Sequence, residues 1–136
     1  MLGRFLIAGE IEAGAVPFGA ARWLSNPSAT AASQLAVVEV TLDPGAGHAF
    51  HHHPRQEEVL YVVSGAVEQW LEQEKRILGP GDGIFIPAGV VHASFNAGAG
   101  PARFVAILGP CVGEAGYEAV EVADRVVEPS PLKDLS

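Results

Sequence analysis

The most constraining feature of this sequence is a series of short apolar runs, rich in β-branched residues, that glycine and proline separate. The runs follow one another at about the 8–12-residue spacing expected of β-sandwiches and barrels. The 16 glycines and 10 prolines supply the turns, and no stretch shows convincing helical periodicity. The sequence therefore predicts an all-β fold with short or no helices. The expected strands are 35–42, 48–53, 58–64, 66–71, 75–78, 84–86, 90–95 and 103–108.

Length, charge and cysteine content limit what the chain can be. At 136 residues it is long enough for one domain with a hydrophobic core and too short for two. A formal net charge of -8 disfavours nucleic acid and membranes as partners, because nucleic acid and anionic lipid repel an acidic surface. No apolar stretch approaches the roughly 20 residues that span a bilayer. The single cysteine, Cys111, allows no intrachain disulfide, so we expect a cytoplasmic location.

The two ends of the chain carry weaker signals than the middle. We expect residues 1–34 to form a strand and loop segment that packs on the barrel, with 5–11 as an edge strand and 23–33 as a loop. Residues 114–124 fit a short helix or a strand equally well. Residues 128–136 are polar and proline-rich, which predicts a mobile tail. The barrel itself is then expected over 35–127.

Three histidines and a carboxylate have a spacing that suits a metal ion. Side chains alternate across a strand, so His51 and His53 share one face. Pro54 ends this strand, which allows a carboxylate to enter from the next one. Glu58 is that carboxylate, although strand parity alone leaves Glu57 open, and His92 adds a third nitrogen from a later strand.

Two longer patterns surround these residues. Positions 45–65 read Gly, five residues, His-x-His, four residues, Glu, six residues, Gly; positions 81–96 read Gly, five residues, Pro-x-Gly, two residues, His, three residues, Asn. Together they resemble the two conserved motifs of the cupin superfamily, in particular its small single-domain, quercetinase-like cupin_2 type. The resemblance implies a double-stranded β-helix, a jelly-roll barrel with the metal inside. It favours Glu58 over Glu57, and the metal ligands that it implies are His51, His53, Glu58 and His92.

The sequence gives less information about the identity of the metal and of the substrate. Three imidazoles and a carboxylate suit one divalent Fe, Mn, Ni, Co, Cu or Zn ion per chain. Strand alternation predicts that Leu60, Val62 and Ser94 line a pocket for a small-molecule ligand, and no catalytic residue beyond the metal ligands stands out. The first hypothesis is a metal-dependent, dioxygenase-like enzyme that acts on a small oxygenated molecule. The alternatives are a Lewis-acid isomerase, cyclase or lyase and a non-catalytic sugar-binding module. The resemblance also implies a homodimer.

Overall fold

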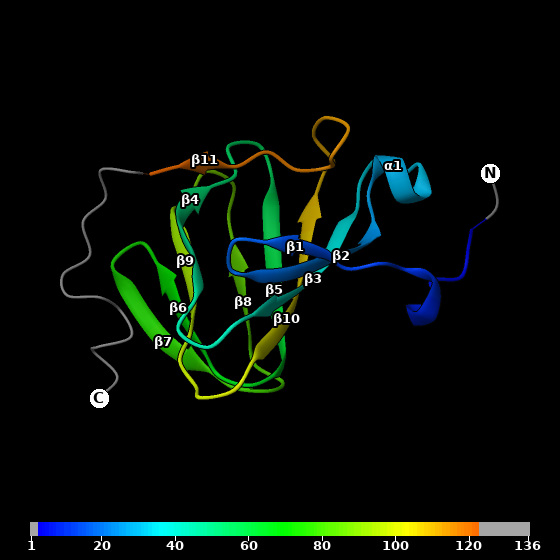
Figure 1. Cartoon of the computed structure of the whole chain (residues 1–136). Helices are drawn as coiled ribbons and strands as arrows, with labels where there is room; N and C mark the ends of the chain where they lie inside the picture. The colour runs from blue at the N-terminus through cyan, green and yellow to red at the C-terminus, as the bar shows by residue number, and fades with distance from the viewer. Residues whose placement is uncertain (1–2, 123–136) are drawn as a thin grey trace.

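The computed structural model of the chain describes residues 3–122. Two antiparallel sheets face each other and enclose the core (Figure 1). The six-stranded sheet has the order β1-β2-β3-β10-β5-β8, and the five-stranded sheet has the order β11-β4-β9-β6-β7. The strands of the first sheet are β1 Gly14–Val16, β2 Gly19–Ser25, β3 Ala36–Leu42, β10 Ala102–Gly109, β5 Glu57–Ser64 and β8 Gly83–Ile86. Those of the second are β11 Val120–Glu121, β4 Gly47–His52, β9 His92–Asn96, β6 Val67–Leu71 and β7 Glu74–Leu78.

The central strands confirm the predicted all-β jelly-roll barrel. Along β3 every second residue is buried, as the period of two in a strand requires. The buried side chains of both sheets meet between them, where Leu42, Leu60, Val62 and Val67 are at most 2% exposed. Only two short helical turns interrupt the strands within the described residues, a 3-10 turn at Ala8–Glu10 and α1 at Pro27–Thr30.

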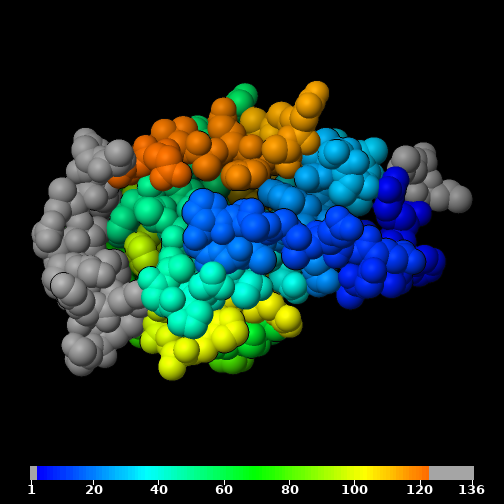
Figure 2. Space-filling model, in the orientation of Figure 1, coloured from blue at the N-terminus to red at the C-terminus, as the bar shows by residue number. Residues whose placement is uncertain are grey.

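The N-terminal part differs from the prediction. Residues 5–11 form no strand, and residues 23–33 are not a continuous loop, because β2 continues to Ser25 and α1 follows. The reason is the pairing of β2 with β3, a partner that lies outside the local sequence. Gly19 makes this pairing possible, since its φ is +147° and any Cβ there would collide with the carbonyl oxygen of Thr41. Figure 2 shows this N-terminal segment in blue, lying against the barrel.

The C-terminal part resolves the alternative left open for 114–124. Val120 and Glu121 form a short strand that pairs with β4, and no helix occurs in 114–122. The loop before it, 110–119, is fastened by the buried side chain of Gln56. Its amide nitrogen donates to the carbonyls of Pro110 (2.7 Å) and Gly116 (2.9 Å). The predicted mobile tail 128–136 lies outside the described residues.

The described residues contain no helix with the length and apolar character needed to cross a membrane.

Candidate metal centre

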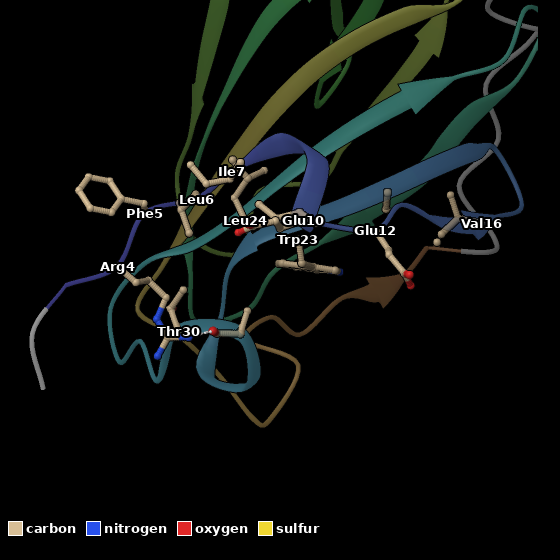
Figure 3. A pocket seen from close by; sticks show the side chains of 14 residues that line it. Arg4, Phe5, Leu6, Ile7, Glu10, Glu12, Val16, Trp23, Leu24 and Thr30 are labelled. Atoms are coloured by element: carbon tan, nitrogen blue, oxygen red, sulfur yellow. Dashed lines mark hydrogen bonds between the residues drawn. The ribbon is translucent and has the colours of Figure 1, made fainter.

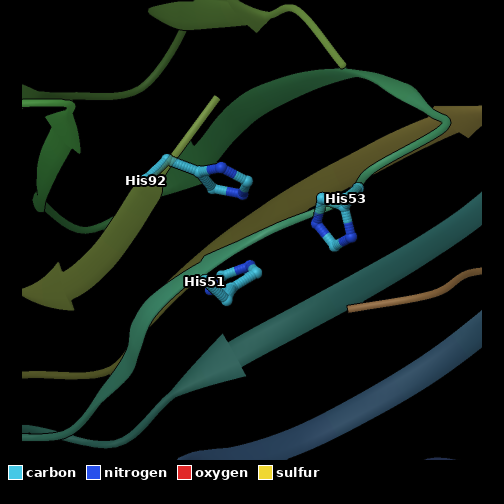
Figure 4. Close-up of side chains that lie close together, drawn as sticks. All are labelled: His51, His53 and His92. Atoms are coloured by element: carbon cyan, nitrogen blue, oxygen red, sulfur yellow. The ribbon is translucent and has the colours of Figure 1, made fainter. Parts of the chain in front are cut away.

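Three buried histidines point into one space inside the barrel (Figure 4). His51 and His92 are direct partners in the antiparallel pairing of β4 with β9, and His53 lies one residue beyond the end of β4. Their side chains are 2–5% exposed, and one ring nitrogen of each lies within 4.8 Å of the other two. The three imidazoles can therefore hold a metal ion together.

Backbone contacts orient each of the three rings. The Nδ1 atom of each ring lies 2.6–2.9 Å from a carbonyl oxygen, which can only accept, so Nδ1 carries the proton and donates it. The Nε2 atom then keeps its lone pair as the ligand atom, which is the tautomer that metal-binding histidines need. The acceptors are Ala49 for His51, Glu118 for His53 and Val90 for His92.

Glu58 brings a carboxylate to the same place. The burial of β5 alternates, so Glu58 is 6% exposed and faces inward while Glu57 is exposed. Its Oε1 atom lies 3.3 Å from Nε2 of His53 and 3.1 Å from Nε2 of His92. The turn at Pro54 separates β4 from β5 and lets the two strands present their side chains to one point.

The electrostatics of this cluster favour a cation. Burial raises the pKa of Glu58, but its contacts with His53 and His92 outweigh burial and lower the pKa to about 2, so the group is a carboxylate at neutral pH. Burial lowers the pKa of His53, but contact with the Glu58 charge outweighs it and the net shift is upward. Burial is the main cause that lowers the pKa of His51 to about 3, so this ring is neutral. The cluster thus combines a buried carboxylate charge with imidazole nitrogens, which is the donor set that a divalent cation needs.

Two buried atoms of this cluster have no hydrogen-bond partner. They are Oε1 of Glu58 and Nε2 of His92, and an unsatisfied buried polar atom normally costs about 1–3 kcal/mol. Two donors bound to one ion at about 2.0–2.1 Å stand about 2.9–3.4 Å apart, and the carboxylate-to-imidazole separations of 3.1 and 3.3 Å fall in that range. The residues present therefore fit a divalent transition metal.

A small cavity of about 120 Å³ adjoins the cluster. Its apolar lining includes Val38, Val40, Phe104 and Ala106. Three of the metal-cluster residues, His51, His53 and Glu58, also border it. A ligand in this cavity would lie against the metal centre.

Two aromatic stacks also border the cavity. The ring of His48 stacks on His51 with centroids 3.9 Å apart and on Phe18 at 4.9 Å. Trp23 stacks on Tyr117 at 5.4 Å. Burial lowers the pKa of His48 to about 4, although the charge of Glu58 opposes this, so the ring is neutral. The side chain of His48 makes no hydrogen bond with another described residue.

The predicted pocket residues lie elsewhere in the barrel. Leu60 and Val62 are part of the hydrophobic core, and Ser94 is buried with its hydroxyl donating to Oε1 of Gln69 at 2.6 Å. None of the three borders the cavity beside the histidines. Val38 and Val40 of β3 border it instead.

Sequence reasoning missed four residues of this cavity. They are Phe18, Trp23, His48 and Tyr117, none of which the sequence pattern assigns to a pocket. Tyr117 had no local signal, because it reaches the cavity only through the anchoring of loop 110–119 by Gln56. The position of His48 three residues before His51 was the one available hint.

Comparison with known proteins gives the same architecture. Residues 38–108 match the Cupin_2 family, described as a cupin domain. Protein SchB of Streptomyces halstedii is 36% identical over 92 residues, covering 68% of this chain and 67% of SchB. Polyketide synthase CurC of Streptomyces cyaneus is 32% identical over 122 residues, covering 86% of this chain and 79% of CurC. The solved structure of KdgF from Halomonas sp. superimposes with a TM-score of 0.74 at 29% identity, covering 82% of this chain and 97% of KdgF.

Proposed function

Since this chain belongs to the cupin family, we propose that it is a metal-dependent enzyme acting on a small oxygenated organic molecule. His51, His53, Glu58 and His92 hold one divalent transition metal in this proposal. The observation that carries it is the pair of buried atoms without hydrogen-bond partners, Oε1 of Glu58 and Nε2 of His92, beside two more imidazoles. Four protein ligands leave two positions of an octahedral shell for substrate oxygens.

The chain's own residues would orient and shield the substrate. A bound divalent ion supplies Lewis acidity toward a carbonyl or enol oxygen. The Nδ1–carbonyl hydrogen bonds keep the three imidazoles in place, and the apolar side chains of the cavity exclude water. The His48 ring borders the cavity and makes no hydrogen bond within the described residues, so it can hydrogen-bond a second polar group of the substrate.

Among the possible reactions, we favour Lewis-acid chemistry, such as cyclisation, isomerisation or lysis, over dioxygenation. The similarity to CurC, which is named a polyketide synthase, supports an enolisable polycarbonyl substrate. This order reverses the one suggested by the sequence alone. A sugar-binding module is the weakest alternative, because the cavity lining contains no Ser, Thr, Asn or Gln side chain to bind sugar hydroxyls.

The test begins with elemental analysis of the protein purified without added metal, scored as ions per chain. Metal-loaded protein is then incubated with 2,4-pentanedione in deuterated buffer, and exchange at the central carbon is followed by NMR. We expect about one ion per chain and exchange faster than with the His92→Ala variant. Oxygen uptake with the same probe would favour the dioxygenase instead. A chain that neither retains nor takes up a transition metal would refute the proposal.

We also propose a homodimer that forms through the outer face of the six-stranded sheet. Val59 of β5 pairs with Phe85 of β8 on one side and with Ile107 of β10 on the other. These three side chains are 36–52% exposed and form one apolar row across the sheet. A row of this kind is self-complementary, because a second copy turned by a two-fold axis presents the same row.

A further inference from the structure

A second hollow lies beside the metal-centre cavity and is larger. It has a volume of about 650 Å³ and lies between the N-terminal arm, residues 4–12, and the β1–β2 hairpin (Figure 3). We call it the arm groove. Its lining combines polar groups with apolar side chains, which include Phe5, Leu6, Ile7, Ile11, Trp23 and Leu24.

The arm is tied to its own chain. The guanidinium of Arg4 donates to the carbonyl of Ala29 at 2.7 Å. Further along, the guanidinium of Arg22 on β2 donates to the carbonyl of Ala8 at 3.4 Å while it pairs with Glu39 at 3.0 Å. These contacts hold the arm over the hairpin, yet Leu6 and Ile7 remain 45% and 50% exposed. The groove is therefore a formed hollow with apolar walls that the arm itself does not fill.

The arm groove and the metal-centre cavity share a wall. Val16, Ala21 and Trp23 border both hollows. Trp23 also stacks on Tyr117, which borders the cavity beside His53. The two hollows are therefore adjacent, and Trp23 lines both of them.

The two hollows differ in the size of the group that each can hold. The cavity of about 120 Å³ has the volume of roughly four liquid water molecules, which is enough for the head of a molecule and too little for most organic substrates. The groove of about 650 Å³ lies inside the range of roughly 300–1,000 Å³ that small-molecule sites occupy. Glu10 and Glu12 outnumber Arg4 among the charged residues that line it, which disfavours an anionic occupant.

We propose that the arm groove binds the uncharged, apolar tail of the molecule whose oxygen-bearing head binds at the metal centre. This inference rests on the proposed function, since it takes the head to be metal-bound. It assigns the substrate to a chemical class: a chelating pair of oxygens joined to an apolar tail of several carbons.

The experiment measures binding of alkyl hydroxamates, which chelate a metal through two oxygens, to the Co²⁺-loaded protein. Acetohydroxamate, hexanohydroxamate and octanohydroxamate share one head and differ only in tail length. Each methylene that leaves water contributes up to about 0.8 kcal/mol, or about fourfold in affinity. We expect octanohydroxamate to bind at least about tenfold more tightly than acetohydroxamate, as the groove is partly open.

Substitutions test whether the tail binds in the groove or nonspecifically at any exposed apolar side chain. Ile7→Ser and Leu24→Ser change groove residues that do not border the metal-centre cavity. Both should abolish most of the gain from the long tail and leave the Kd of acetohydroxamate unchanged. Ile77→Ser on β7 is the matched control, because Ile77 is 48% exposed, close to the 50% of Ile7, and borders neither hollow. All three variants should melt within a few degrees of the wild type.

The outcomes distinguish the groove from the metal site. Equal affinity for the short and long hydroxamates would overturn the proposed role of the groove but not the metal site. The same holds if both groove variants retain the gain in affinity that the long tail gives. Failure of acetohydroxamate to bind the Co²⁺-loaded protein would overturn the proposed function and the groove with it. Conversion of a dimer to a monomer by Ile7→Ser in sedimentation would assign the groove to a second copy and also overturn the inference.

Discussion

Replacing His92 by alanine tests the metal centre directly, with His52→Ala as its matched control. His92 is 2% exposed, and its unsatisfied Nε2 atom lies 3.1 Å from Glu58. His52 lies on β4 next to His51, but it is not one of the three clustered imidazoles. Both changes remove one imidazole from the same part of the barrel, and only the first removes a proposed ligand.

The magnitude follows from linkage between metal binding and folding. A metal at one hundred times its Kd stabilises the folded chain by about 2.7 kcal/mol, which raises the Tm of a domain of this size by roughly 10 °C. Loss of one of four ligands, with one carboxylate neighbour left unpaired, should remove nearly all of this gain. The Tm without metal will also fall in His92→Ala, because a buried ring is lost, so the relevant quantity is the shift that metal produces.

The assay combines elemental analysis with thermal melting of the chelator-treated protein, before and after addition of one equivalent of metal. The wild type and His52→Ala should carry about one ion per chain and show the full shift. His92→Ala should carry little metal and show almost none. Equal occupancy and equal shifts in all three proteins would show that His92 is not a ligand. A loss in His52→Ala as large as that in His92→Ala would show that the strand register is wrong.

Three further predictions address pH, backbone conformation and assembly. The pKa of His48 is lowered from 6.5 to about 4 by burial, so below pH 6.5 the unfolded state binds more protons and the folded state loses stability as the pH falls. Between pH 7 and pH 5 the metal-free wild type should therefore lose up to about 2 kcal/mol more than His48→Phe in urea unfolding, and equal losses would contradict the shift. Gly65 has a φ of +80°, and a Cβ there would lie 2.7 Å from the Cα atom of Ala102, so Gly65→Ala should destabilise the fold by about 1–3 kcal/mol; an unchanged urea midpoint would contradict the turn geometry. If the outer face of the six-stranded sheet forms the dimer, Phe85→Lys should give a monomer in sedimentation while Ile77→Lys should not.

The barrel strands could be predicted because their signals are local in the sequence, and the ligand set because two motifs with family-like spacing mark it. The alternation in 36–42 encodes a strand with one buried face, whatever its neighbours are. The turn at Pro54 and the spacing from His51 to Glu58 place two short strands so that their side chains converge. The geometry of ligands on either side of such a turn depends on a few consecutive dihedral angles. The number of residues between these ligands is therefore fixed, and the sequence shows it.

The walls of the cavity depended on contacts between distant segments. Nothing near Trp23 indicates a strand strongly, and β2 forms because β3 offers it an edge and Gly19 allows close approach. Tyr117 reaches the cavity only because Gln56, far earlier in the chain, binds the loop that carries it. His48 is held beside the cavity by stacking on Phe18, which the β1–β2 hairpin supplies. The sequence by itself determined the strand pattern and the converging ligands, whereas only tertiary packing decided which side chains surround the ligands, because burial and stacking are set by partners that no local pattern names.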